Sequence, residues 1–232
     1  MGTIVCWSAK GGSGTTVVAA ALALVSPLPA LLVDLADDAP AALGLPDHTG
    51  QGVADWLRSD APVEAVEDLA VPVDATTSVV PRGEGPLEPV AARWAELASW
   101  LAARTDWVIV DAGTAPPPLA LATNARSLLV TRACYLGLRN AARSPIRPDG
   151  VVLVAEPGRA LRAGDVEHAV GAPVVTTVSV DPLVARAVDA GLLAARLPRA
   201  LCRELRCIVE APRAMPPLRP LFERPIRVAS RR

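Results

Sequence analysis

The residues with the clearest chemical potential lie at positions 10–16, which read Lys-Gly-Gly-Ser-Gly-Thr-Thr. The apolar, β-branched residues 3–7 before them predict a strand, and the alanine-rich residues 17–25 after them predict a helix. A glycine loop between a strand and a helix directs several backbone N–H groups and the positive end of the helix dipole at one point. This segment therefore predicts a cradle for the phosphates of a nucleotide.

The source of positive charge in this cradle is unusual. The ordinary P-loop pattern, G-x-x-x-x-G-K-[ST], fits in one register, which puts Ala9 at the first glycine, Thr15 at the lysine and Thr16 at the magnesium-ligating hydroxyl. Threonine cannot neutralise the β- and γ-phosphates. Lys10, however, is the sole lysine among 23 basic residues, which indicates a need for a compact ammonium charge at this place. The alternative is a glycine-rich turn with an incidental lysine.

With Lys10 ahead of the glycines, residues 10–14 resemble the deviant P-loop of the ParA/MinD family of ATPases. The resemblance implies that ATP or ADP binds here with Mg²⁺, and that Lys10 reaches across a nucleotide-sandwich homodimer to the partner's phosphates. It also implies that Thr16 ligates the magnesium ion. The residues expected to donate backbone N–H groups to the phosphates are Gly11, Gly12, Ser13, Gly14 and Thr15.

Three carboxylates are candidates for work around the magnesium ion. Asp34 ends the apolar run 30–33, and the sequence Val-Asp-Leu-Ala-Asp-Asp resembles the family's second nucleotide motif, D-x-D. Ala36 occupies the second position, where the family carries a carboxylate that positions the attacking water. Asp37 is a candidate substitute, and the alternative is that Asp37 and Asp38 form only a solvated charge run. This departure questions hydrolysis more than nucleotide binding.

Asp111 ends a second apolar run, residues 106–111, about one hundred residues after the loop. The run resembles a Walker B strand, which implies that Asp111, like Asp34, acts through the water shell of the magnesium ion. By analogy with the family's switch II, residues 113–118 are expected to form a mobile or ligand-sensing loop; the sequence by itself supports only a rigid, irregular loop. By the same resemblance the backbone of residues 179–182, which include Asp181, contacts the adenine base; a plain strand-to-helix connection is the alternative.

The elements that must position these residues alternate along the chain. Strands are expected at residues 30–33, 78–80, 127–131, 150–156 and 174–178, and helices at residues 49–59, 87–104, 135–143, 181–191 and 198–210. This alternation predicts an α/β fold with a doubly wound, mostly parallel sheet, helices on both faces and the ligand at the carboxyl ends of the strands. The resemblance implies a P-loop NTPase of the SIMIBI type.

Composition agrees with such a fold and sets off the end of the chain. Hydrophobic residues make up 51% of the 232 residues and aromatic residues only 3%, so Ala, Val and Leu must build the core. Ten arginines face three glutamates from residue 196 onward. We expect a nucleotide-binding domain at residues 1–195, a C-terminal helix at 196–210 and a flexible, basic Pro/Arg-rich tail at 211–232. Such a tail suits DNA phosphates, anionic lipid or an acidic partner protein.

The four cysteines form no C-x-x-C pair, and two histidines are too few for a metal cluster. Buried thiols in a reducing cytosol are therefore expected. Residues 17–25 are too short to span a bilayer and no signal sequence precedes the first strand, which predicts a cytoplasmic protein, peripheral to nucleoid or membrane if the tail binds there.

Together these features predict a nucleotide-dependent dimerisation switch with weak, partner-stimulated ATPase activity that positions or recruits a cargo, as in partition, polar localisation or pilus and secretion assembly. Within the family, the loop most closely resembles CpaE/TadZ-like members, which share the threonine at the usual lysine position. The alternative is a non-hydrolysing P-loop scaffold that acts as a protein-interaction module, because both Thr15 and Ala36 depart from the family pattern.

Overall fold

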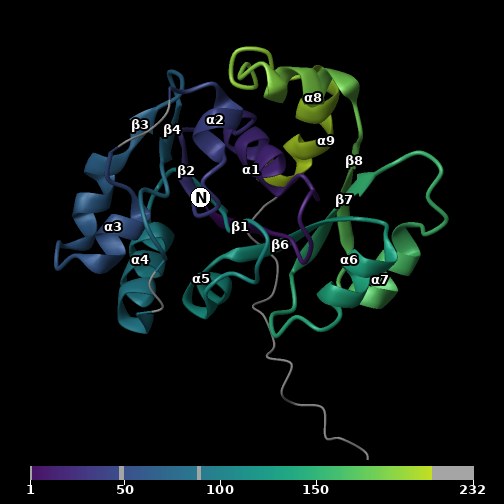
Figure 1. Ribbon diagram of the computed structural model, residues 1–232, viewed down its shortest axis with the longest axis horizontal. Coiled ribbons are helices and arrows are strands. Elements are labelled where there is room, and N and C mark those ends of the chain that lie inside the picture. The colour runs from purple at the N-terminus through teal and green to yellow at the C-terminus, as the bar shows by residue number, and fades with distance from the viewer. Residues whose placement is uncertain (1, 47–49, 88–89, 211–232) are drawn as a thin grey trace, which may run out of the picture.

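The computed structural model of the chain describes residues 2–46, 50–87 and 90–210 (Figure 1). Within these residues the chain forms one sheet of eight strands in the order β3-β4-β2-β5-β1-β6-β7-β8. All neighbouring strands are parallel except the edge pair β3 and β4. The strands are β1 (Thr3–Trp7), β2 (Ala30–Asp34), β3 (Val71–Pro72), β4 (Thr77–Val80), β5 (Trp107–Asp111), β6 (Arg126–Arg132), β7 (Gly150–Ala155) and β8 (Val174–Ser179).

Helices connect these strands and cover both faces of the sheet, as Figure 1 shows. They are α1 (Thr15–Leu24), α2 (Ala39–Leu43), α3 (Val53–Arg58), the 3₁₀ helix η1 (Val63–Leu69), α4 (Ala91–Ala103), α5 (Leu119–Asn124), α6 (Tyr135–Ala141), α7 (Ala163–Val170), α8 (Pro182–Asp189) and α9 (Arg199–Glu210). The fold is therefore the doubly wound α/β arrangement that the sequence predicts.

Alternating side chains of the central strands separate two core layers. In β1, Ile4 and Cys6 pack on the side of α1, α8 and α9, whereas Val5 packs on the side of α3 and α4. Trp7 packs on that second side as well, against residues of α6 and α7. The same alternation recurs along β2, β5 and β6, so the strands are buried on both faces, as parallel strands require.

The register of the central strands brings the two strand-terminal aspartates together. Cys6 in β1 pairs with Asp111 in β5, and Asp34 in β2 also pairs with Asp111. The carboxyl ends of β1, β2 and β5 therefore meet at one edge of the sheet. The loop that leaves β1 at Ser8 lies at the same edge, since its N–H donates to the Gly113 carbonyl at 2.9 Å.

Most predicted elements agree with the structure, and the differences lie at helix ends and in short helices. The first helix begins at Thr15 rather than at residue 17, and the helix expected at residues 87–104 is α4, which begins after Val90. The helix expected from residue 49 is α3, and its expected first residue lies outside the described residues. Elements without a prediction are β3, η1, α2, α5 and α7.

The cysteines only partly match the expectation of buried thiols. Cys6 is fully buried, and burial raises the pKa of its thiol well above the usual range. Cys134 and Cys202 are half-buried and Cys207 is exposed, so burial was wrongly expected for Cys207. None of the helices in residues 2–46, 50–87 and 90–210 is both long and apolar enough to cross a bilayer. The expected basic tail, residues 211–232, lies outside the described residues.

Candidate nucleotide site

The loop between β1 and α1 has the backbone of a phosphate cradle. Gly12 and Gly14 adopt left-handed conformations, with φ of +74° and +88°, which side chains disfavour. Gly14 caps α1, so the first turn of that helix, with its free N–H groups, opens directly from the loop. The Ser13 hydroxyl donates to the Lys10 carbonyl at 2.7 Å and closes the loop on itself. The turn is thus held in one shape by its own atoms.

A cavity of about 740 Å³ lies beside this loop, at the carboxyl edge of the sheet. Its wall is contributed by four segments of the chain, from the β1–α1 loop, the loop after β2, the loop after β4 and the loop after β5. The residues that line it are Ser8, Gly12, Ser13, Gly14, Thr15, Thr16, Val17, Leu35, Ala36, Asp37, Asp38, Arg82, Leu87, Ala112, Gly113, Thr114 and Ala115. This volume is within the usual range for a small-molecule site.

Asp111 is buried beneath the cavity with one oxygen unsatisfied. Its Oδ1 accepts from the Gly113 N–H at 3.0 Å, whereas its Oδ2 is buried and has no hydrogen-bond partner among the described residues. Burial raises the pKa of Asp111, although the Thr16 hydroxyl and the Gly113 N–H oppose that rise, and the nearby Asp38 raises it further. An uncompensated carboxylate beside a threonine hydroxyl suits the water shell of a divalent cation.

Asp34 is buried beside it but is fully engaged by the loop that follows β2. Its Oδ1 accepts from the N–H groups of Ala36 at 2.8 Å and Asp37 at 3.0 Å, and its Oδ2 accepts from the N–H of Ala39, the first residue of α2, at 3.1 Å. Burial raises the pKa of Asp34 to about 6 despite these three donors, with Asp111 as a further cause. Asp34 therefore organises the 36–39 loop, and its action on magnesium stays a prediction.

The loop that Asp34 organises is strained at Asp37. Asp37 has φ of +78°, and it is the one non-glycine residue with positive φ among those that the structure describes. Its side chain is 66% exposed and pairs with Arg82 at 3.7 Å. Ala36 lies against the loop after β5, because a Cβ placed on Gly113 would be 3.1 Å from the Ala36 Cβ. The position where the D-x-D motif carries its second carboxylate thus presents only a methyl group.

The predicted site residues separate into three groups. Gly12, Ser13, Gly14, Thr15, Thr16 and Asp37 line the cavity, and Asp34 and Asp111 lie buried at its base. Lys10 and Gly11 are exposed and do not line it; the Lys10 ammonium donates to the Gly11 carbonyl at 3.3 Å. Asp181 does not line it either, and instead caps α8 by accepting from the Leu183 N–H at 2.8 Å.

No magnesium site made of protein carboxylates alone is present in the part of the chain that the structure describes. Within these residues, no three His, Cys, Asp or Glu side chains come close enough to hold a metal ion. A magnesium ion here would accordingly be held by the Thr16 hydroxyl, by phosphate oxygens and by water, with Asp111 in contact with that water. This donor set agrees with the coordination preference of Mg²⁺, which usually retains several water ligands.

Sequence reasoning missed the cavity-lining Arg82 and the contact between α6 and the loop. Arg82 follows the carboxyl end of β4, and the Asn140 side-chain amide in α6 donates to the Ala9 carbonyl at 3.1 Å. The available signal for Arg82 was its place just after a parallel strand, where side chains face the ligand crevice. Asn140 offered no signal, since its partner is a backbone carbonyl 131 residues away.

The chain has the fold of the P-loop NTPases of the ParA/MinD type. Among solved structures, a ParA family ATPase from Chlorobium tepidum superposes with a TM-score of 0.72 at 19% identity, over 90% of this chain and 98% of that chain. The septum site-determining protein MinD of Pyrococcus horikoshii, complexed with Mg-ADP, has a TM-score of 0.69 at 18% identity, over 89% and 93% of the two chains.

A third similar structure is the MinC:MinD cell division complex of Aquifex aeolicus, with a TM-score of 0.69, 18% identity, and coverage of 95% of this chain and 99% of that chain. At these identities the likeness establishes the fold. No protein-family model matches the sequence. No curated protein matches it either.

Proposed function

We propose that this protein is a nucleotide-dependent switch of the ParA/MinD type that binds ATP with Mg²⁺, dimerises, and positions or recruits a cargo. The observation that carries the proposal is the cradle itself. Two left-handed glycines open onto the N-terminus of α1 in a cavity of about 740 Å³, above a buried Asp111 whose Oδ2 lacks a partner among the described residues. Support also comes from the similar fold of MinD of Pyrococcus horikoshii, whose structure is a complex with Mg-ADP.

In this proposal each residue has one task. The backbone N–H groups of residues 11–15 bind phosphate oxygens, and Thr16 and Asp111 hold the magnesium ion and its water. ATP with Mg²⁺ supplies the phosphoryl bond whose weak hydrolysis resets the switch. Asp37 orients water at the strained turn, and Lys10 acts in the partner subunit, which agrees with its exposed position outside the cavity of its own chain.

The cargo and partners follow from the resemblance and from charge. The loop's threonine at the lysine position favours a CpaE/TadZ-like role in polar localisation or pilus and secretion assembly, and partition is the other candidate. A partner protein is expected by analogy with the MinC:MinD complex. The six arginines among residues 211–232 favour anionic surfaces, either DNA or membrane, which accords with the cytoplasmic, peripheral location that the sequence predicts.

A second candidate function is a non-hydrolysing P-loop scaffold that acts as a protein-interaction module. The observation that favours it is the methyl group of Ala36, packed against Gly113 where the motif has its water-positioning carboxylate. Asp37, the candidate substitute, is held at its own N–H by Asp34 and faces Arg82. In the scaffold, Asp37 would have only this structural task.

The deciding experiment is light scattering of the purified protein with Mg²⁺ alone, with ADP and with ATP, combined with analysis of the nucleotide in the eluted peak. A dimer that forms only with ATP supports the switch. Phosphate release from that dimer separates the two candidates, since the scaffold retains intact ATP. Absence of bound nucleotide under every condition contradicts the switch and indicates a retired P-loop that binds other proteins through its surface.

A further inference from the structure

The cavity beside the glycine loop has more acidic than basic side chains around it. Asp37 and Asp38 line the cavity and Asp34 and Asp111 are buried at its base. Thr15 brings no charge, and Lys10 does not line the cavity of its own chain. A triphosphate entering such a site meets carboxylates from one subunit before any second subunit has arrived. Mg²⁺ and the backbone N–H groups of the loop would offset part of this repulsion, and a cationic side chain of the same subunit would offset more of it.

Arg82 is the one cationic side chain among the described residues that line this cavity. It follows the carboxyl end of β4, which is separated from β1 by the strands β2 and β5. The arginine thus belongs to the wall of the same cavity as the glycine loop, but comes from a different segment of the chain. Its side chain is 25% exposed, so its charge is partly shielded from bulk solvent.

The contacts that hold the Arg82 guanidinium are weak enough to be exchanged. Its Nη2 donates to the Gly85 carbonyl at 2.9 Å, and its Nη1 approaches Asp37 at 3.7 Å. The Asp37 side chain is 66% exposed, and an ion pair of that length and exposure contributes little to stability. A phosphate that pairs with both terminal nitrogens offers a stronger, bidentate contact. Arg82 can accordingly leave Asp37 for a ligand.

The backbone that carries Arg82 is, by contrast, fixed by α3. The Pro81 and Arg82 carbonyls accept from the N–H groups of Val53 at 3.0 Å and Ala54 at 2.8 Å. These bonds lie on both sides of the Arg82 Cα and are donated by the first turn of α3, which has no partners within its own helix for those N–H groups. The base of the arginine side chain is therefore immobilised while its guanidinium keeps some freedom.

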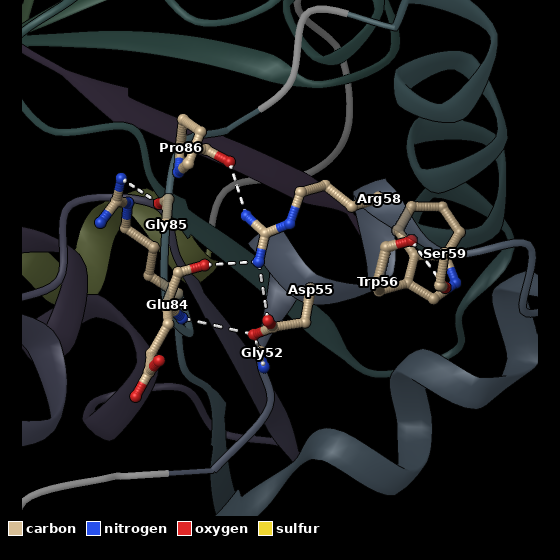
Figure 2. A network of polar contacts seen from close by, with 9 residues as sticks. Gly52, Asp55, Trp56, Arg58, Ser59, Glu84, Gly85 and Pro86 are labelled. Carbon is tan, nitrogen blue, oxygen red and sulfur yellow. Dashed lines mark hydrogen bonds and ion pairs between the residues drawn. The ribbon is translucent and has the colours of Figure 1, made fainter.

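Figure 2 shows how the next residues of the same loop are clamped by Arg58 and Asp55 of α3. Arg58 donates to the Glu84 carbonyl at 2.7 Å, to the Pro86 carbonyl at 3.1 Å and to Asp55 at 2.8 Å. The other Asp55 oxygen accepts from the N–H groups of Glu84 at 3.3 Å and Gly52 at 2.9 Å. One ion pair thereby ties two carbonyls and two N–H groups of separate segments.

Close packing leaves this loop no alternative path. Gly83 has φ of +75°, and a Cβ there would be 2.2 Å from the Asp55 carboxylate. Gly52 is equally restricted, since a Cβ on it would be 2.4 Å from the Pro81 carbonyl and 2.3 Å from the Gly83 nitrogen. Such contacts are met only by glycine, so the segment 81–86 is built to present Arg82 at one place.

We propose that Arg82 binds the phosphates of the nucleotide in its own subunit, and that the Asp55–Arg58 clamp positions it. Arg82 would thereby replace the lysine that the ordinary P-loop pattern has at the position of Thr15. The inference rests on the proposed nucleotide-binding function and adds to it a binding residue in cis. Asp37 holds the guanidinium until phosphate replaces it. The site therefore has two cations with separate tasks, Arg82 for binding within one chain and Lys10 for the dimer.

Titration calorimetry of the monomeric Lys10→Ala protein tests the proposal without interference from dimerisation. The probes are Mg-ATP, AMP and inorganic tripolyphosphate. Arg82→Ala in this background should weaken ATP and tripolyphosphate binding about tenfold or more and leave AMP binding nearly unchanged, because the loss of one bidentate charged contact acts on the distal phosphates. Arg206→Ala removes the same charge from an ion pair of 3.8 Å on α9 and should change none of the three affinities.

The Thr15→Lys substitution gives a second and independent test. In the Lys10→Ala background it should tighten ATP binding, and combined with Arg82→Ala it should restore most of the lost affinity, because either cation can then satisfy the phosphates. The double-mutant cycle should show strong coupling between positions 15 and 82. Equal ATP affinity with and without Arg82, in variants whose unfolding midpoints match, overturns the proposal.

The outcomes also separate this proposal from the function on which it rests. Binding of tripolyphosphate but not ATP, with loss on Arg82→Ala, supports Arg82 as an anion-binding residue and rejects the nucleotide switch. ATP binding that ignores Arg82 supports the nucleotide function and rejects the role of Arg82. Failure of all three probes to bind overturns both.

Discussion

The buried aspartates at the base of the cavity suit a bound cation but destabilise the ligand-free fold. Asp34 is completely buried, and its three backbone donors shape the 36–39 loop. Burial still raises its pKa to about 6, and burial raises the pKa of the neighbouring Asp111 as well. Two carboxylates close together in a dry place destabilise the ligand-free fold when both are charged. A bound divalent cation would remove that cost.

Asp34 is expected to make the stability of the ligand-free protein depend on pH. Because its pKa rises from 3.8 in the unfolded chain to about 6 in the fold, the folded state holds the proton more tightly. Its contribution to the unfolding free energy is full below about pH 4 and is lost as the pH rises to about 6, by about 2–3 kcal/mol. Urea unfolding between pH 4 and 7 should show the difference between wild type and Asp34→Asn falling over this interval.

Asp74 provides the matched control for that measurement. Burial alone would raise the pKa of Asp74, but hydrogen bonds from Thr76 and Thr77 outweigh it and lower the pKa. Its contribution is present above the unfolded value and is lost as the pH falls. The difference between wild type and Asp74→Asn should therefore not decrease from pH 4 to 6. A falling difference for both variants would contradict the assignment to Asp34.

Lys10 is expected to matter for dimerisation and not for folding. Its side chain is exposed and its ammonium contacts only the neighbouring Gly11 carbonyl among the interactions of the described residues. Lys10→Ala should leave the unfolding midpoint unchanged and abolish the ATP-dependent dimer in light scattering. Lys10→Arg keeps the charge with a planar group and tests whether a compact ammonium is needed. A Lys10→Ala protein that still dimerises with ATP refutes the deviant P-loop interpretation.

Motif spacing identified the candidate residues in the glycine loop and at strand ends, and missed those that are positioned by distant segments of the chain. The positions of Gly12, Gly14, Thr16 and Asp111 followed from the loop pattern and from a carboxylate at the end of an apolar run. Arg82 stands alone in a stretch rich in proline and glycine, where no motif marks it. Its place depends on α3, almost thirty residues earlier, through contacts that spacing does not encode.

At the scale of elements, α3 and the loop after β4 form one unit around Arg58. The guanidinium bonds two loop carbonyls and the Asp55 carboxylate, while the first N–H groups of α3 bond Pro81 and Arg82. Trp56 in the same helix is buried and lies under the Arg93 guanidinium of α4, at 3.6 Å from its ring centroid. The short helix α3 is thus held by tertiary contacts rather than by its own length.

Arg58→Ala is expected to loosen the loop that carries Arg82. Loss of two charged hydrogen bonds to carbonyls and of one ion pair should lower the free energy of unfolding by about 1–3 kcal/mol. ATP affinity should fall as well, because Arg82 loses its fixed position. The control is Glu84→Gln in the same loop, whose exposed side chain should affect neither quantity. Chemical unfolding and calorimetry check both; unchanged ATP affinity in a destabilised Arg58→Ala protein would contradict the positioning role of the clamp.

The sequence predicted the strands better than the helices, for a physical reason. Buried parallel strands are continuous apolar runs, and β1, β5 and β7 are found within one residue of their expected limits. Helices α2 and α5 have only five and six residues, too few for a 3.6-residue period to be recognised. The 3₁₀ helix η1 and the edge strand β3 depend on packing beside α4 and β4, which the local sequence does not reveal.

At the scale of the whole molecule, the C-terminal helix α9 belongs to the same core layer as the helix that follows the glycine loop. Leu201, Leu205 and Ile208 are buried in the cluster that contains most of α1. Figure 1 shows α9 beside α1 and β8. Polar contacts join it to β8, since the Glu204 carboxylate accepts from the Ser179 hydroxyl at 2.9 Å. Removal of α9 would expose the apolar back of α1.

Two truncations should separate this structural helix from the residues that follow it. A chain that ends after Glu210 retains α9 and should keep its unfolding midpoint and its ATP affinity, but lose any binding to DNA or anionic vesicles that salt weakens, because six arginines are removed. A chain that ends after Pro198 loses α9 and should unfold at much lower urea concentration. Leu205→Ala keeps the chain length and should cost about 2–5 kcal/mol, which attributes the loss to packing.

The contact between α9 and α1 joins the C-terminal helix to the candidate nucleotide site. The N-terminus of α1 forms part of the cradle, whereas α9 packs against the side of the same helix. If α9 has only a structural role, Leu205→Ala should weaken ATP binding only to the extent that it unfolds the protein. Calorimetry at a urea concentration where the variant remains folded measures that directly. ATP affinity that drops in the folded variant would contradict a purely structural role and would connect the C-terminal segment to the nucleotide state of the cradle.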